Sequence, residues 1–212
     1  MITEENAEEM LLHFKPWRDV AGDAHPFYHN DTWYLFYLTQ NFNSRLLTSR
    51  DLVRWQRVRL SHTPTGKGNP TLQPYYVLGV FWDEAAGLFR TYHGDVGNVM
   101  KSHFSTDLVN WDFAPAPYTI PAQERYSQQR DPYVFWNDAE QQYWVVMTCK
   151  VKGAPEGANG AICFASSPDL QHWEGRGDLY YPGNVGDPEV PQMFRIGDKW
   201  YLFASLYRAG RG

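Results

Sequence analysis

Four acidic residues stand in short motifs just ahead of apolar runs, where carboxylates could carry acid–base chemistry. Asp23 lies in "AGDAHPFYH", Asp131 in "QQRDPYVFW", and Asp187 and Glu189 lie together in "GDPEVPQMF". Cleavage of a glycosidic bond needs one carboxylic acid to protonate the leaving oxygen and one carboxylate as nucleophile or as base for water. Taken singly, each of them is expected to be an ordinary acidic residue of a turn, and Asp-Pro, as at Asp131 and Asp187, is typical of loops. The chemistry therefore depends on whether the fold brings them together.

A repeated motif indicates how the chain is organised. The pattern Ser-x-Asp-Leu-x-x-Trp occurs as "SRDLVRW" at 49–55, "STDLVNW" at 105–111 and within "SSPDLQHW" at 166–173. Four positions agree in each copy, so chance is a poor explanation. We expect the Ser and Asp side chains to fix a turn by hydrogen bonds and the Trp to pack between repeated units.

Three short aromatic and β-branched runs precede each copy, separated by turn compositions such as "HND" and "DEAAG". These runs cover residues 26–29, 33–38 and 45–49, then 77–82, 88–92 and 99–105, then 133–136, 143–147 and 161–167. Each unit therefore predicts three strands, an Asp-Leu turn and a fourth strand carrying Trp. A four-stranded antiparallel unit that recurs at this length is a blade of a β-propeller.

The predicted fold is all-β, a partial propeller over residues 1–212. Blade one covers about 23–60, blade two about 75–115, blade three about 131–178, and an incomplete fourth starts at about 187 with runs at 191–196 and 200–206. A closed propeller needs at least four blades, so the sequence predicts a fragment, or an open edge covered by a second chain or by another copy. The one helix expected covers residues 3–12.

Three of the units carry an acidic motif just before their first strand. Asp23 stands there in unit one, Asp131 in unit three, and Asp187 with Glu189 in unit four, whereas unit two has no acid. First strands lie nearest the axis of a propeller, so we expect these carboxylates to converge at one mouth. Their mutual repulsion would raise at least one pKa, as a general acid requires.

Composition restricts the other classes of function. The net charge of −5 and the pI of about 5.8 argue against a nucleic-acid or anionic membrane surface. No apolar run approaches the roughly 20 residues of a membrane helix, and the acidic start "MITEENAEEM" is no secretory signal. We expect Cys149 and Cys163 to be free thiols of a cytoplasmic protein, with a processed secreted form as the alternative. The seven scattered His predict no metal site, and no cofactor motif is present.

Several stretches resemble glycoside hydrolase family 32, the invertase, levanase and fructosidase group. "GDAHPFYHNDTWYLFYL", "RDPYVFWNDAEQQYWVVM" and "EVPQMFRIGDKWYLFAS" are similar, in this order, to the three acidic motifs of that family. The Ser-x-Asp-Leu-x-x-Trp repeat also resembles a family segment, and the resemblance covers about residues 14–206. It implies a five-bladed propeller that cleaves fructosyl or related furanosyl linkages with retention of configuration.

The resemblance also implies roles for individual residues. Asp23 matches the nucleophile, Asp131 the transition-state stabiliser and Glu189 the acid/base. Asp187-Pro188 imitates the Arg-Asp-Pro motif, but the spacing of Glu189 to Pro191 and Phe194 favours Glu189. The candidate substrate-binding residues are Arg130, His25, Trp33 and Asp187.

This chain departs from the family around its acids. Gly22-Asp23-Ala24-His25 replaces the usual Asn-Asp-Pro-Asn-Gly, and Val190 replaces the Cys that usually follows the acid/base. An inverting, arabinosidase-like propeller and a non-catalytic carbohydrate-binding propeller stay open as alternatives.

Overall fold

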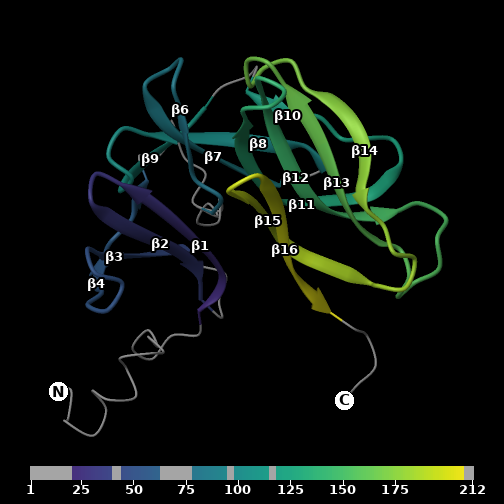
Figure 1. Ribbon diagram of the computed structural model, residues 1–212, viewed down its shortest axis with the longest axis horizontal. Coiled ribbons are helices and arrows are strands. Elements are labelled where there is room, and N and C mark those ends of the chain that lie inside the picture. Colours follow the sequence, from purple (N-terminus) through teal and green to yellow (C-terminus); the bar gives the residue numbers. More distant parts are fainter. Residues whose placement is uncertain (1–20, 40–43, 63–77, 95–97, 115–117, 208–212) are drawn as a thin grey trace, which may run out of the picture. The chain divides into compact units, whose positions relative to one another are not determined.

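The computed structural model describes residues 21–39, 44–62, 78–94, 98–114 and 118–207 (Figure 1). Strands make up the regular elements of these ranges, and none of their residues belongs to a helix long and apolar enough to cross a membrane. The helix expected over 3–12 lies outside the described residues. The chain forms two compact units, one with the described residues up to Leu78 plus Ser105–Asp112, the other with Gly79–Phe104 and the described residues from Phe113 on.

The first unit is built on a four-stranded sheet that runs in chain order. Its strands are β1 (Gly22–His29), β2 (Thr32–Leu38), β3 (Ser44–Ser49) and β4 (Gln56–Val58), and each neighbouring pair is antiparallel. The run "TWYLFYL" of β2 buries Phe36, Tyr37 and Leu38. The Phe36 ring meets Trp111 edge-on, with 6.2 Å between the centroids, so the repeated Trp contributes to this core.

A second sheet has the order β5–β9–β8–β7–β6, with β10 also paired to β8. Its strands are β5 (Ser61–His62), β6 (Phe81–Asp83), β7 (Leu88–Gly94), β8 (Met100–Ser105), β9 (Asn110–Phe113) and β10 (Thr119–Ile120). The short β5 pairs with β9 in parallel. Neither β5 nor β10 is among the strands predicted from the sequence.

The second unit also holds a four-stranded antiparallel sheet and a two-stranded one. The first contains β11 (Tyr126–Asn137), β12 (Gln142–Val151), β13 (Gly160–Ser167) and β14 (Glu174–Tyr180) in chain order. The other pairs β15 (Asp187–Ile196) with β16 (Lys199–Tyr207), drawn in yellow-green to yellow in Figure 1. The four-stranded sheets follow chain order, which confirms the propeller-type fold. The last sheet has two strands, β15 and β16.

The repeated motif forms the same turn three times. In each copy the Asp N–H donates to the Ser Oγ, and Asp Oδ1 accepts the N–H groups two and three residues further on. The Trp Nε1 donates to the Leu carbonyl, and each Leu has a left-handed φ of 61–67°. The expectation that Ser and Asp fix the turn is confirmed.

The placement of the repeated Trp differs from the expectation in two copies. Only Trp111 lies inside a fourth strand, whereas Trp55 and Trp173 end the turn directly before β4 and β14. The indole hydrogen bond to the Leu carbonyl is present in all three copies, so each Trp belongs to its turn whether or not it also lies in the strand.

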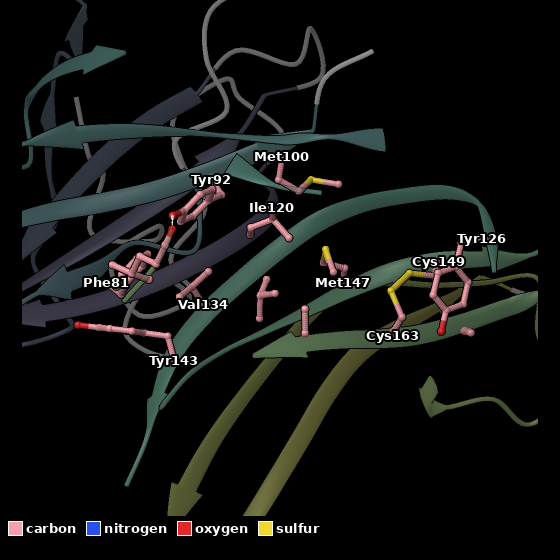
Figure 2. Close-up of a cluster of buried hydrophobic side chains, with 14 of the residues drawn as sticks. Phe81, Tyr92, Met100, Ile120, Tyr126, Val134, Tyr143, Met147, Cys149 and Cys163 are labelled. Atoms are coloured by element: carbon pink, nitrogen blue, oxygen red, sulfur yellow. Dashed lines mark hydrogen bonds between the residues drawn. A yellow bond between two sulfur atoms is a disulfide. The ribbon is translucent and has the colours of Figure 1, made fainter. Parts of the chain in front are cut away.

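The core of the second unit draws on strands β6 to β8 and β10 to β13 (Figure 2). Phe81 of β6 stacks on Tyr92 of β7 at 6.2 Å and also contacts Tyr143 of β12, 6.0 Å between centroids. The Tyr92 ring meets Trp173 edge-on, which places this repeated Trp between two consecutive sheets. Aromatic contacts of this kind join neighbouring blades.

The expectation of two free thiols is wrong. Cys149 of β12 and Cys163 of β13 form a disulfide, and both are fully buried. Met147 is the cross-strand partner of Cys163, so the two cysteines are diagonal neighbours on adjacent antiparallel strands, with Cα atoms 6.0 Å apart. A sequence separation of 14 gave no hint of this, because the pairing depends on the β12–β13 register.

We predict that Ser105→Ala lowers the free energy of unfolding by about 1–2 kcal/mol, since a buried and a part-buried backbone N–H group lose their acceptor. Those groups belong to Asp107 and Leu108. Urea denaturation measures the change, with the exposed Ser205→Ala as the control. Equal midpoints for wild type and Ser105→Ala would show that the turn does not depend on this hydroxyl.

The disulfide predicts that denatured, unreduced protein takes up no alkylating reagent, whereas reduced protein takes up two adducts by mass spectrometry. The double variant Cys149→Ala/Cys163→Ala should lose about 3 kcal/mol of stability, the value for a loop of about 15 residues. Reductant should destabilise the wild type and leave the double variant unchanged. Uptake of reagent before reduction would contradict the disulfide.

Candidate active site

Asp23 and Asp131 occupy the same structural position in two sheets. In β1 the pairing register with β2 shifts between Gly22 and His25, so Asp23 and Ala24 form a β-bulge. In β11 the register with β12 shifts in the same way between Arg130 and Tyr133, around Asp131 and Pro132. Both acids therefore lie inside a strand, not before it as the sequence suggested, and a bulge redirects each side chain.

A third bulge lies in β15, where the register with β16 shifts between Glu189 and Gln192. Its residues are Val190 and Pro191, so Val190 is the counterpart of Asp23 and Asp131. Glu189 stands one position earlier and corresponds to Arg130. Asp23 and Asp131 are therefore equivalent in position, as expected, whereas Glu189 lies one residue before the equivalent position in β15.

The three bulge residues share a left-handed backbone, with φ of 50° at Asp23, 51° at Asp131 and 54° at Val190. Asp adopts this region comparatively easily, whereas a β-branched residue there is an outlier that costs on the order of 1–3 kcal/mol. Strain of this kind clusters at functional sites. Val190, directly after Glu189, therefore marks the β15 bulge as a candidate functional position.

One guanidinium group connects the acids of the second unit. Arg130 Nη2 donates to Asp187 Oδ1 at 2.6 Å and to Glu189 Oε1 at 2.7 Å. Arg130 Nε lies 3.5 Å from Asp131 Oδ2. The structure therefore brings together Arg130, Asp131, Asp187 and Glu189, four of the residues predicted from the sequence.

A second cation, Lys150 of β12, reinforces this cluster. Its Nζ donates to Asp187 Oδ2 at 2.7 Å and to the Gly186 carbonyl at 2.6 Å. Burial would raise the pKa of Asp187, but hydrogen bonds from Lys150 and Arg130 outweigh it and hold that pKa below its usual range. Asp187 is thus an ionised partner of two cations, which suits a positioning role better than acid catalysis.

Asp131 is the acid with a raised pKa. Burial is the main cause; the charge of Arg130 and a hydrogen bond from the Val190 N–H oppose it, and Glu189 adds a small repulsion. The sequence-based expectation named repulsion between carboxylates as the cause. In this cluster the charge of Arg130 offsets most of that repulsion, so burial is the main cause of the raised pKa of Asp131.

Close contacts hold β15 against the neighbouring sheet. Thr148 Oγ1 donates to the Pro188 carbonyl at 3.0 Å, and the Gly160 N–H donates to the Val185 carbonyl at 2.8 Å. A Cβ on Gly160 would lie 2.5 Å from the Gly186 oxygen and 2.7 Å from Pro188 Cδ. Only glycine permits this approach, so β12 and β13 set the position of the segment that carries Asp187 and Glu189.

His25 and Trp33 belong to the first unit. His25 follows the bulge of β1 and is 4% exposed, and burial lowers its pKa to about 4, so its ring is neutral at neutral pH. Trp33 pairs with Tyr28 near the hairpin end of β1 and β2. Tyr28 lies five residues along β1 from Asp23, which is roughly 16 Å at the usual rise per strand residue. The hairpin therefore does not bring Trp33 together with Asp23.

Lys150 and Thr148 are site residues that the sequence reasoning missed. They lie two positions apart in "VVMTCKV", so their side chains share one face of β12. A lysine within a buried apolar strand was the available signal, because such a charge needs a partner. Its partner came from β15, far along the chain, and only the tertiary fold revealed it.

Comparison with known proteins agrees with this architecture. Residues 13–209 match the model of the glycosyl hydrolases family 32 N-terminal domain. An extracellular exo-inulinase of Aspergillus niger is 22% identical over 93% of this chain and 44% of its own length. The chain thus spans less than half the length of this curated relative.

Solved structures share the fold. A thermostable family-43 glycoside hydrolase superposes with a TM-score of 0.66 at 15% identity, over 89% of this chain and 64% of that one. A sucrose-6-phosphate hydrolase from Lactobacillus gasseri gives a TM-score of 0.64 at 17% identity, over 95% of this chain and 48% of that one.

We predict that Lys150→Met lowers the free energy of unfolding by about 1–2 kcal/mol at pH 7, because Asp187 loses a charge-assisted partner. Since the pKa of Asp187 is lowered in the folded state, this contribution is present above about pH 4 and disappears as pH falls through the folded pKa. Urea denaturation at pH 7 and pH 3 should show a difference that shrinks in acid.

The exposed Lys152→Met, two residues along, is the matched control and should leave stability nearly unchanged. A deficit for Lys150→Met that is equally large at both pH values would refute the ion pair as its cause.

Proposed function

Because the chain belongs to glycoside hydrolase family 32, we propose that the protein cleaves fructosyl or related furanosyl linkages by a two-carboxylate retaining mechanism. The observation that carries the proposal is the contact of Arg130 with Asp131, Asp187 and Glu189. Three carboxylates around one partly buried cation supply acceptors for sugar hydroxyls and negative charge opposite a developing positive charge. The name of the A. niger relative, an exo-inulinase, supports a fructan as substrate.

In the proposed reaction, Asp23 attacks the anomeric carbon while Glu189 protonates the leaving glycosidic oxygen. A covalent fructosyl–Asp23 ester forms and the aglycone departs. Glu189, now ionised, takes a proton from water, whose oxygen attacks the anomeric carbon and releases Asp23. Each step conserves charge, and no cofactor takes part.

Asp131 is the proposed transition-state stabiliser, accepting hydrogen bonds from sugar hydroxyls. Arg130 and Asp187 are proposed to bind and position groups around the leaving oxygen, and the neutral ring of His25 to contact the sugar near Asp23. The position of Trp33 near the hairpin end of β1–β2 gives its proposed role less support.

A second candidate is an inverting, arabinosidase-like hydrolase, favoured by the fold shared with a family-43 enzyme. Cleavage in the presence of methanol separates the two. A retaining enzyme transfers the glycosyl group to methanol with its original configuration, whereas inversion gives no such product. A carbohydrate-binding propeller without turnover, the third candidate, predicts binding of fructans and no cleavage.

We also propose that further polypeptide, either more of the protein, a second copy or another chain, covers the sheet of β15 and β16. This sheet has two strands, whereas the other sheets of the described residues have four or six, and Phe203 and Ile196 on it are 64% and 61% exposed. An uncovered strand edge with such residues invites association.

A cytoplasmic location stays a prediction, which fractionation of the native cells tests. A buried disulfide is more typical of oxidising compartments.

The proposed acid/base role predicts that Glu189→Gln lowers kcat/KM for sucrose or inulin by about 10²–10⁴-fold. The loss should be much smaller on a nitrophenyl fructoside, whose leaving group needs little protonation. A purely structural role would lower both rates alike.

Glu156→Gln changes an exposed loop carboxylate and serves as the control. Full activity of Glu189→Gln on inulin would eliminate Glu189 as the acid. Absence of any cleavage by the wild type, with fructan binding retained, would favour the non-catalytic candidate.

A further inference from the structure

A groove of about 810 Å³ lies in the second unit, outside the acid cluster. The turn between β6 and β7, the hairpin end of β11–β12 and the Ser-Asp-Leu turn after β13 form its walls. Its lining includes Trp82, Glu84, Tyr118, Trp136, Asp169 and Gln171. Trp136 follows Asp131 by five residues on β11, roughly 16 Å at strand rise, so the groove lies toward the opposite end of that strand.

Two tryptophans present apolar faces to this groove. Trp82 is 38% exposed and Trp136 is 40% exposed. Each is held by an aromatic partner on the neighbouring strand: Trp82 by Phe89 at 4.8 Å and Trp136 by Tyr143 at 4.9 Å between centroids. Trp82 Nε1 also donates to Glu84 at 2.7 Å. The rings are therefore pre-positioned, and binding would need little further ordering.

Asp83, one of the residues that line the groove, forms a buried ion pair with Arg90. Arg90 donates from Nη2 and Nε to Asp83 Oδ2, at 2.6 and 3.0 Å, and both side chains are 3% exposed. The Arg90 guanidinium lies 4.1 Å from the centroid of the Tyr118 ring, whose hydroxyl accepts a hydrogen bond from Gln171. A buried ion pair beneath an aromatic ring provides a rigid base.

The rim offers hydrogen-bond acceptors and an amide next to the aromatic rings. The carboxylate of Glu84 accepts the Trp82 indole N–H and keeps free lone-pair directions. That of Asp169 already accepts hydrogen bonds from Ser167, Gln171 and His172, so Glu84 is the acceptor with room for a ligand. Flat apolar faces beside acceptors and an amide match a ligand with C–H faces and many hydroxyl donors. Sugars have this chemistry.

We propose that the groove is a second carbohydrate-binding site, which takes a neutral oligosaccharide stacked on Trp82 and Trp136. It would hold a distal part of a fructan chain and raise the local concentration of substrate without contacting the acid cluster. The choice of a sugar as occupant rests in part on the proposed function, whereas the shape and rigidity of the groove do not.

The test uses a short inulin-type oligosaccharide and the Glu189→Gln protein, so that the probe stays intact. With 5-fluorotryptophan incorporated, the ¹⁹F resonances of Trp82 and Trp136, assigned through Trp82→Phe and Trp136→Phe, should shift on titration. The apparent dissociation constant for inulin, obtained from retardation in a native gel that contains inulin, should rise at least fivefold for Trp136→Ala in the same background. Tyr181→Ala, which removes a 37% exposed aromatic outside the groove, should not change it.

With Glu189 intact, Trp136→Ala should hydrolyse a nitrophenyl fructoside within twofold of the wild-type rate. Unmoved Trp82 and Trp136 resonances, with or without shifts of other tryptophans, would overturn the second site and leave the proposed hydrolysis standing. Shifts in a protein that cleaves nothing would support the groove and count against the hydrolase. Self-association that the Trp82→Ala/Trp136→Ala variant abolishes would assign the groove to a protein partner.

Discussion

The contact of Arg130 with three carboxylates is the interaction on which the candidate site depends. Asp187 and Glu189 come from β15 and Asp131 from β11, and all three lie within 3.5 Å of one guanidinium. Without that cation, the partly buried acids would repel one another and at least one would take up a proton. Lys150 adds a second positive charge, so Asp187 stays ionised while burial raises the pKa of Asp131. Two acids with opposite pKa shifts thus share one cation.

The repeated β-bulge is the backbone feature that makes this contact geometrically available. Three first strands bulge at equivalent places, and each bulge begins with a residue of positive φ. A regular strand would alternate its side chains between the two faces, whereas a bulge inserts one residue and redirects its neighbours. Glu189 lies before its bulge and the two Asp residues lie within theirs. The acids therefore occupy two kinds of position, which fits different chemical tasks.

Most of the strands were predictable because the forces that define them are local. The aromatic runs and the Ser-x-Asp-Leu-x-x-Trp turns follow from alternation and from hydrogen bonds that span at most three residues. The short strands β5 and β10 were missed, since two-residue pairings leave no periodic signal. The Cys149–Cys163 bond was missed because it follows from the register of β12 with β13.

The sequence alone determined the repeat, the family resemblance and the identity of the acids in the cluster, because each of these is written in a contiguous motif. Tertiary structure decided which cations meet those acids, the one-residue offset of Glu189 and the direction of the pKa shifts at Asp131 and Asp187. These depend on segments up to 59 residues apart. Charge and burial act through space, and only the folded chain defines the distances over which they act.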